Sequence, residues 1–180
     1  MLIGISGDIG AGKDTSADYL VEKHGFTKRA FAYPLKQACK ELFLLTDEQV
    51  YTNKEKPDER WFGCKPRTML QYVGSELLRD RLSPIIPELG KDIFIRNLEL
   101  WLKEHPDINV VVPDVRFVNE IELIERLGGK VVRIERKVDF VSNHVSETTL
   151  RNHKFECVIE NNGTKEELYK KIDELLKVST

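Results

Sequence analysis

The chain has 180 residues, of which 41% are hydrophobic and 32% are charged, and its formal net charge is −2. This composition excludes a disordered chain, and the longest apolar runs are too short to cross a bilayer. The small net charge gives no indication of nucleic-acid or membrane binding. Three widely separated cysteines favour a reducing compartment over a disulfide framework or a zinc site. We therefore expect one cytoplasmic domain of 180 residues.

The hydrophobic pattern alternates between strands and helices along the chain. It predicts strands at 2–6, 26–31, 109–113, 130–135 and 155–159. It predicts a first helix that ends at Gly25, and later helices at 35–45, 67–79, 92–104, 119–127 and 164–178. Residues 47–66 are polar and are predicted to be irregular. Strands that alternate with helices indicate a parallel sheet covered on both faces, hence an α/β fold of three layers with five parallel strands.

The segment between the first strand and the first helix carries the clearest motif. Its residues, Gly7-Asp8-Ile9-Gly10-Ala11-Gly12-Lys13-Asp14-Thr15, have the spacing of a phosphate-binding P-loop. Glycines allow backbone N–H groups to converge on a phosphate, and the helix that follows adds the positive end of its dipole. Lys13 would hold the β- and γ-phosphates of a nucleotide. Asp14 stands where Ser or Thr usually serves Mg²⁺, and we expect it to serve the ion directly or through water.

Other candidate residues follow the apolar strand 109–113. Ligands of parallel sheets bind outside the carboxyl ends of the strands, which predicts that the P-loop, the 31–36 turn and the 114–116 turn share one edge. Asp114 would be a second carboxylate that supports Mg²⁺, and the alternative is a helix N-cap. Arg116 would grip a phosphate with two hydrogen bonds. Arg116 and Glu120 also have the spacing of an ordinary surface ion pair.

Three further polar side chains are candidates for binding the acceptor. One follows the second strand, and two lie in the helix at 67–79. Lys36 follows the second strand, while Arg67 and Gln71 lie on one side of that helix. Arg67 could bind an acceptor phosphate, and Gln71 has both a donor and an acceptor for the edge of a base. Taken singly, each is also explained as surface charge or polarity. Aromatic residues such as Trp61 lie nearby in sequence and could stack on a base.

Two segments near the C-terminus could complete a nucleotide site. Basic residues around 136–153, namely Arg133, Arg136, Lys137 and Arg151, could belong to a lid that excludes water and brings cations to the transferred group. The turn Asn161-Asn162-Gly163-Thr164 begins the last helix and could meet an adenine ring. An ordinary charged loop and a plain turn are the alternatives.

Four stretches together resemble the deoxynucleoside monophosphate kinases of bacteriophages and large DNA viruses. They are residues 7–15, Phe31-Ala32-Tyr33-Pro34-Leu35-Lys36, Arg67-Thr68-Met69-Leu70-Gln71-Tyr72-Val73-Gly74, and Pro113-Asp114-Val115-Arg116-Phe117-Val118-Asn119-Glu120. The tail 159–164 is also similar to dephospho-CoA kinases, and Gly-Lys-Asp at 12–14 to animal phosphomevalonate kinases. All three groups have a nucleoside-monophosphate-kinase-like P-loop fold.

The resemblance implies a transfer of phosphate from ATP-Mg²⁺ to a deoxynucleoside 5′-monophosphate, which gives the diphosphate. It places this reaction in one domain, with an acceptor segment at about 34–90 and a lid at about 136–153. It implies catalytic roles for Lys13, Arg136 and Asp114, and a metal-binding role for Asp14. The implied ATP-binding residues are Gly10, Ala11, Gly12, Lys13, Asp14, Thr15, Arg136, Asn161, Gly163 and Thr164. The implied acceptor-binding residues are Lys36, Trp61, Arg67, Gln71, Asp114, Arg116 and Glu120.

Small nucleotides are the partners that the resemblance implies, and it allows a homodimer; a viral enzyme would act in the host cytoplasm. Two other functions compete. One is a related small-molecule kinase that acts on dephospho-CoA or phosphomevalonate. The other is an ATP-dependent switch; a GTP-dependent one is disfavoured, because Asn53-Lys54-Glu55-Lys56 lacks the Asp that ends the guanine-reading tetrad.

Overall fold

The computed structural model describes all residues except 90, 138–148, 151 and 179–180. Its contacts group the chain into two compact units, which we describe separately. The sheet unit contains Met1–Ala30 and Trp101–Thr180, and the helical unit contains Phe31–Leu100. No helix among the described residues is long and apolar enough to cross a membrane. The assignment of 34–90 to acceptor binding and of 136–153 to a lid stays a prediction.

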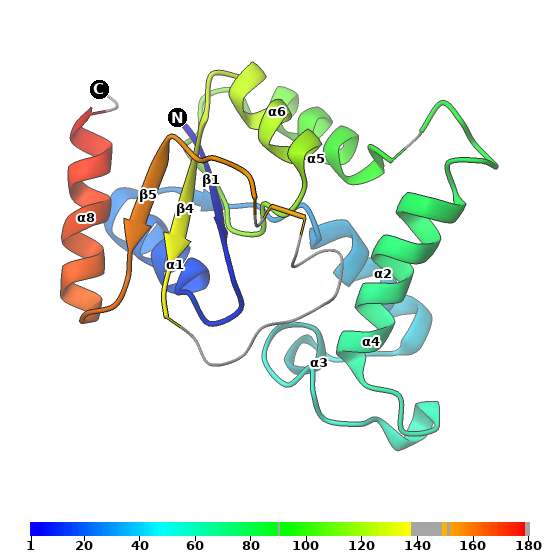
Figure 1. Cartoon of the computed structure of the whole chain (residues 1–180). Coiled ribbons are helices and arrows are strands. Elements are labelled where there is room, and N and C mark those ends of the chain that lie inside the picture. Colours follow the sequence, from blue (N-terminus) through cyan, green and yellow to red (C-terminus); the bar gives the residue numbers. More distant parts are fainter. Residues whose placement is uncertain (90, 138–148, 151, 179–180) are drawn as a thin grey trace. The chain divides into compact units, whose positions relative to one another are not determined.

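The sheet unit is built on five parallel strands in the order β2-β3-β1-β4-β5. Their bounds are β1 Leu2–Gly7, β2 Thr27–Lys28, β3 Val110–Val112, β4 Lys130–Glu135 and β5 Cys157–Glu160. This confirms the predicted five-stranded parallel sheet. β2 is shorter than the predicted 26–31, because only Thr27 and Lys28 pair with β3 at this edge of the sheet. Figure 1 shows β1, β4 and β5 side by side, with the helix α8 along β5.

The two faces of β1 explain the layers of the sheet unit. Ile3 and Ile5 point to one face, where they belong to a buried cluster with Leu20 of α1 and Leu168 of α8. Gly4 points to the other face, as alternate residues of a strand do. A Cβ atom at Gly4 would lie 2.5 Å from Ile124 of α6, so the missing side chain allows α6 to approach the strand.

Within the described part of the sheet unit, three helices cover these faces, and the sequence predicts each of them. They are α1 Lys13–His24, α6 Val118–Arg126 and α8 Lys165–Val178. α1 ends at Gly25, which has φ 68° and whose N–H is bonded to the last turn. α1 and α8 pack together through Tyr19 and Tyr169, whose rings stack at 4.0 Å. The result is a three-layer α/β arrangement around a parallel sheet.

The helical unit consists of short helices joined by turns. Their bounds are α2 Tyr33–Phe43, α3 Asp47–Tyr51, the 3₁₀ turn η1 Glu59–Trp61, α4 Pro66–Gln71, the π-helix η2 Tyr72–Arg81 and α5 Ile93–Glu104, the last of which extends beyond Leu100. The prediction that 47–66 is irregular is wrong for α3. Thr46 and Gln49 form a reciprocal capping box at its start, and this Thr-x-x-Gln pattern is readable in the sequence.

The predicted helix at 67–79 is observed as α4 followed directly by η2. Gly74 is buried within it, and a Cβ atom there would lie 2.6 Å from Leu35 of α2. The glycine that weakens the helix in isolation thus permits a close approach between two helices. Farther along, Arg79 is buried, with its guanidinium 5.4 Å from the centre of the Phe94 ring.

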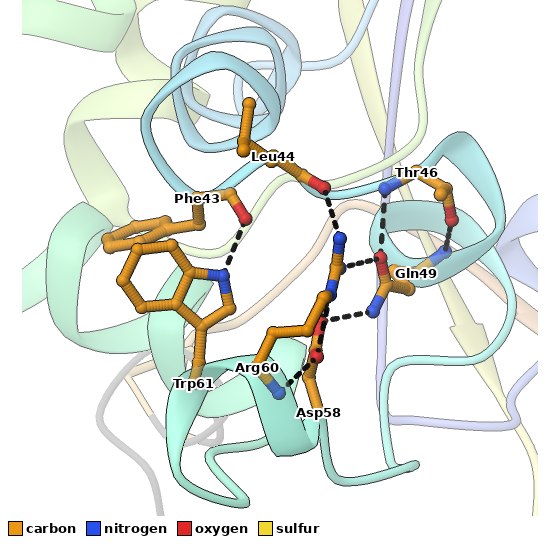
Figure 2. Close-up of polar contacts among 7 residues, drawn as sticks. All are labelled: Phe43, Leu44, Thr46, Gln49, Asp58, Arg60 and Trp61. Carbon is orange, nitrogen blue, oxygen red and sulfur yellow. Dashed lines mark hydrogen bonds and ion pairs between the residues drawn. The ribbon is translucent and has the colours of Figure 1, made fainter.

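A polar network holds the turn between α3 and α4 (Figure 2). Asp58 lies at its centre and is 6% exposed. Its Oδ2 accepts hydrogen bonds from Arg60 Nη2 at 2.6 Å and Gln49 Nε2 at 2.8 Å, and its Oδ1 accepts from Arg60 Nε at 2.9 Å. The guanidinium of Arg60 also donates to the carbonyl of Leu44 at 3.3 Å. The network thus ties this turn to the segment after α2.

Candidate active site

The predicted P-loop connects the central strand β1 to α1. Gly10 and Gly12 have φ values of 80° and 108°, a region that L side chains rarely adopt. A Cβ atom at Gly12 would also lie 2.5 Å from Asn161 Nδ2. Two requirements, backbone conformation and space, therefore explain why glycine occupies position 12.

Lys13 begins α1 and turns back over the loop. Its Nζ donates hydrogen bonds to the carbonyl oxygens of Gly7 at 2.7 Å and Asp8 at 2.8 Å. Burial, and next the positive charge of Arg116, lower the pKa of Lys13 to about 8. The negative charges of Asp14 and Asp8 raise this pKa, but by less than burial and the positive charges lower it. Burial and neighbouring positive charge thus both disfavour the ammonium in its present surroundings.

Two side chains from elsewhere in the sheet unit, one in β4 and one directly after β5, contact the P-loop. Arg133 of β4 donates from Nη2 to Asp8 Oδ1 at 3.1 Å, and its side chain is 12% exposed. Asn161, buried at the end of β5, donates from Nδ2 to the carbonyl of Ala11 at 2.8 Å. The sequence suggested Arg133 as a lid residue and Asn161 as a contact to adenine. In the structure both side chains instead contact the P-loop. These contacts depend on how the strands pair, which no local sequence motif shows.

The turn after β3 lies beside the P-loop, as predicted, because β1 and β3 are paired and parallel. Val115 N–H donates to the carbonyl of Ile5 in β1 at 3.1 Å. Glu120 is buried, and its Oε2 accepts from the backbone N–H groups of Arg116 at 2.8 Å and Phe117 at 3.2 Å. Glu120 therefore fixes the main chain that carries Arg116. Asp114 lies half-buried in the same turn, and acceptor contacts for Asp114, Arg116 and Glu120 stay predictions.

Asp14 lies in the first turn of α1, directly after Lys13. Its side chain is 83% exposed, and its Oδ1 is 3.2 Å from Lys28 Nζ at the end of β2. Among the described residues no cluster of three or more His, Cys, Asp or Glu could hold a metal. Mg²⁺ in phosphoryl-transfer sites needs fewer, because one or two carboxylates act together with phosphates and water. An exposed carboxylate beside the P-loop fits this donor set.

Three predicted residues of the helical unit, Lys36, Arg67 and Trp61, have partners within that unit. The ammonium of Lys36 lies 4.1 Å from the centre of the Tyr51 ring. Arg67 Nε donates to Glu55, and Gln71 is half-buried at the end of α4. Trp61 donates from Nε1 to the carbonyl of Phe43 at 2.7 Å and packs edge-on against its ring (Figure 2). Trp61 is thus part of the local packing, while its neighbour Phe62 is 99% exposed.

The other candidates belong to the C-terminal half of the sheet unit. Arg136 is exposed after β4, and the backbone N–H of Lys137 donates to Asn162 Oδ1 at 3.0 Å. Thr164 Oγ1 accepts from Glu167 N–H at 3.3 Å and caps α8, and Gly163 precedes it. Most of the predicted lid, including Arg151, lies outside the described residues. Roles for Arg136, Gly163 and Thr164 in ATP binding stay predictions.

Comparison with known proteins identifies the family. The model of the deoxynucleotide monophosphate kinase family matches residues 67–172. A protein of Acanthamoeba polyphaga mimivirus, provisionally named a deoxynucleotide monophosphate kinase, is 49% identical over 181 residues, which cover 96% of this chain and 94% of that protein. The chain belongs to the deoxynucleotide monophosphate kinase family. Members of this family are phosphotransferases by name, which agrees with the P-loop and the parallel sheet.

Other similar proteins match either a shorter part of the chain or the whole chain at much lower sequence identity. The deoxynucleotide monophosphate kinase of Escherichia phage RB69 is 35% identical over 68 residues, which are 37% of this chain and 28% of that enzyme. The solved structure of shikimate kinase from Aquifex aeolicus covers 99% of this chain and 97% of its own at 15% identity, with a TM-score of 0.48. Dephospho-CoA kinase from Campylobacter jejuni covers the same shares at 14% identity, with a TM-score of 0.47. At these values the structural likeness does not bear on function.

Proposed function

We propose that this chain transfers the γ-phosphoryl group of ATP to a deoxynucleoside 5′-monophosphate, giving ADP and the deoxynucleoside diphosphate. The observation that carries the proposal is a P-loop with Lys13 at the carboxyl end of β1, beside the turn after the paired strand β3 that contains Arg116. These positive groups are close enough for Arg116 to lower the pKa of Lys13. An anionic ligand would relieve this repulsion, and phosphate groups have the charge and hydrogen-bonding geometry to do so.

Family membership supports the choice of acceptor, because the relatives are named for deoxynucleotide monophosphates. Lys13 would hold the β- and γ-phosphates, and the P-loop N–H groups would surround them. Arg116 would bind the acceptor phosphate, with Lys36, Arg67 and Gln71 of the helical unit as further acceptor contacts. The acceptor phosphate is already an anion at neutral pH, so alignment and charge stabilisation suffice without a strong general base.

Mg²⁺ is the metal we propose to accompany ATP. Asp14 would hold it directly or through water, with Asp114 as a second carboxylate on the same edge. A metal ion held there would supply positive charge that offsets the negative charge of the phosphate groups. A cytoplasmic location, a homodimer and the absence of nucleic-acid partners also remain predictions from the sequence.

The direct test is the dependence of ADP formation on an acceptor. With deoxynucleoside monophosphates added, ADP and deoxynucleoside diphosphate should appear in equal amounts, at a rate far above that with ATP alone. An ATP-dependent switch would instead release ADP and inorganic phosphate at a rate that added nucleotides do not change, and this result would overturn the proposal.

A further inference from the structure

The P-loop of this chain contains a negative charge where a neutral hydroxyl is usual, and a lysine from a separate strand lies against it. Lys28, the last residue of β2, places its Nζ 3.2 Å from Asp14 Oδ1 and 2.9 Å from Asp18 Oδ1. Asp14 and Asp18 are one turn apart on α1, where two like charges repel each other. The ammonium of Lys28 therefore forms an ion pair with each of the two carboxylates.

The position of Asp14 makes its charge matter for a polyphosphate. It immediately follows Lys13 at the start of α1, where the helix N-terminus otherwise favours anions. A carboxylate at this point repels the phosphates that the P-loop is built to bind. An ammonium within 3.2 Å of the carboxylate offsets that repulsion without removing the oxygen atoms that could serve a metal.

We propose that Lys28 is a positioning residue that neutralises Asp14 and thereby permits the P-loop to bind the phosphates of ATP. This inference rests on the proposed nucleotide site and goes beyond it, because neither the P-loop motif nor the family likeness assigns a role to Lys28. A lysine side chain is an ammonium at neutral pH, so Lys28 places a positive charge directly beside the carboxylate of Asp14.

An ordinary surface salt bridge is the alternative, and the two readings predict different results. An exposed ion pair that only joins β2 to α1 contributes little to stability. Its loss would change the Kd of charged and of neutral ligands by the same factor. The proposed role predicts a loss of affinity that depends on ligand charge and on Asp14. Lys28 lies on an edge strand and is 35% exposed, so its substitution is compatible with folding.

The experiment measures the Kd of ATP in EDTA, of ATP with Mg²⁺, and of adenosine by calorimetry. Lys28→Met should weaken binding of ATP in EDTA about tenfold, the order expected for one unit charge near a polyphosphate at a protein surface. The weakening should be smaller with Mg²⁺, which screens the phosphates, and absent for adenosine. Lys28→Arg should retain affinity, and Lys28→Glu should lose more than Lys28→Met. Lys23→Met, which removes an exposed lysine from α1, the helix that carries Asp14, is the matched control and should bind like the wild type.

The second arm repeats Lys28→Met in an Asp14→Asn background. If Lys28 acts through Asp14, the further loss of ATP affinity should be about twofold or less. An equal loss in both backgrounds, an equal loss for adenosine, or wild-type affinity in Lys28→Met would overturn the inference. Thermal unfolding of each variant verifies folding, and the Arg and Glu variants test the charge effect if Lys28→Met does not fold. Failure of the wild type to bind ATP would instead refute the proposed function.

Discussion

Arg133 of β4 donates a hydrogen bond from Nη2 to Asp8 Oδ1 of the P-loop at 3.1 Å, and only 12% of the Arg133 side chain is exposed. This contact joins β4 to the P-loop. The guanidinium therefore acts as a support for the loop in which Asp8 and Lys13 lie. Its removal should allow the loop to adopt conformations that do not bind phosphate.

We expect Arg133→Met to raise the KM for ATP by about tenfold while the KM for the acceptor changes little, since a charged hydrogen bond of this kind contributes about 1.5–3 kcal/mol. Steady-state kinetics with each substrate varied in turn measures both constants. Lys130→Met, which removes an exposed cation from the same strand, is the control. A change in the acceptor KM alone would contradict the support role.

The pKa of Lys13, about 8, predicts that ATP affinity depends on pH. Below pH 8 the group is an ammonium and is ready to bind phosphate, whereas above pH 8 it must first take up a proton. The Kd for ATP should therefore rise about tenfold between pH 7 and pH 9. Calorimetry in buffers with different ionisation enthalpies should detect proton uptake at pH 8.5. Lys13→Arg keeps its charge over this range and should lose the dependence. A constant wild-type Kd would show that the group does not titrate there.

Arg67 and Arg116 are the arginines that we assign to the acceptor. Arg67→Ala and Arg116→Ala should each raise the acceptor KM about 10- to 100-fold, the equivalent of 1.5–3 kcal/mol for a lost bidentate contact, with a much smaller effect on the KM for ATP. Arg81→Ala is the control for the helical unit and Arg126→Ala for the sheet unit, since both arginines are exposed. If the effect fell mainly on ATP, these two arginines would belong to the other substrate.

Asp58 should make the stability of the helical unit dependent on pH. Its hydrogen bonds with the side chain of Arg60 and next with that of Gln49 hold the pKa of its carboxyl well below the usual range. Because the folded state lowers this pKa, the ionised carboxylate stabilises the fold at pH values above 3.8, the ordinary pKa of the group. This stabilisation is lost as the pH falls below 3.8. Asp58→Asn should lower Tm by several degrees at pH 7 and reduce the fall of Tm between pH 5 and pH 3. The exposed Asp80→Asn should follow the wild type, and parallel curves for all three proteins would contradict this role.

The parts of the site that the sequence predicts are those encoded locally. Gly12 and Lys13 lie within one motif, and Asp114 and Arg116 directly follow a buried strand, so the neighbouring strand ends bring them to one edge. Lys28 was missed, because its contact with Asp14 depends on how β2 pairs with β3. The partner of Trp61, the carbonyl of Phe43 18 residues earlier, is likewise set by packing.

The secondary structure also divides into elements that the local sequence predicts and features that depend on packing. Strong apolar periodicity predicts α6 and β4 within a residue at each end. The prediction that 47–66 is irregular is wrong for α3, because the capping box of Thr46 and Gln49 starts a helix in spite of the polarity of the segment. Gly74 weakens the helix when its sequence is considered alone, and the reason for a glycine there becomes visible only when Leu35 of α2 lies against it.

The central claim is that this chain phosphorylates deoxynucleoside monophosphates, and a coupled assay of ADP formation across a panel of acceptors tests it most directly. The panel contains the four deoxynucleoside monophosphates, the matching ribonucleotides, dephospho-CoA and phosphomevalonate, with folded Lys13→Ala as the inactive control, whose turnover should fall by about 10²–10³-fold or more. We predict turnover with deoxynucleotides, slower turnover with ribonucleotides, and none above background with the other two. A clear preference for dephospho-CoA or phosphomevalonate, or undiminished turnover by Lys13→Ala, would contradict the account.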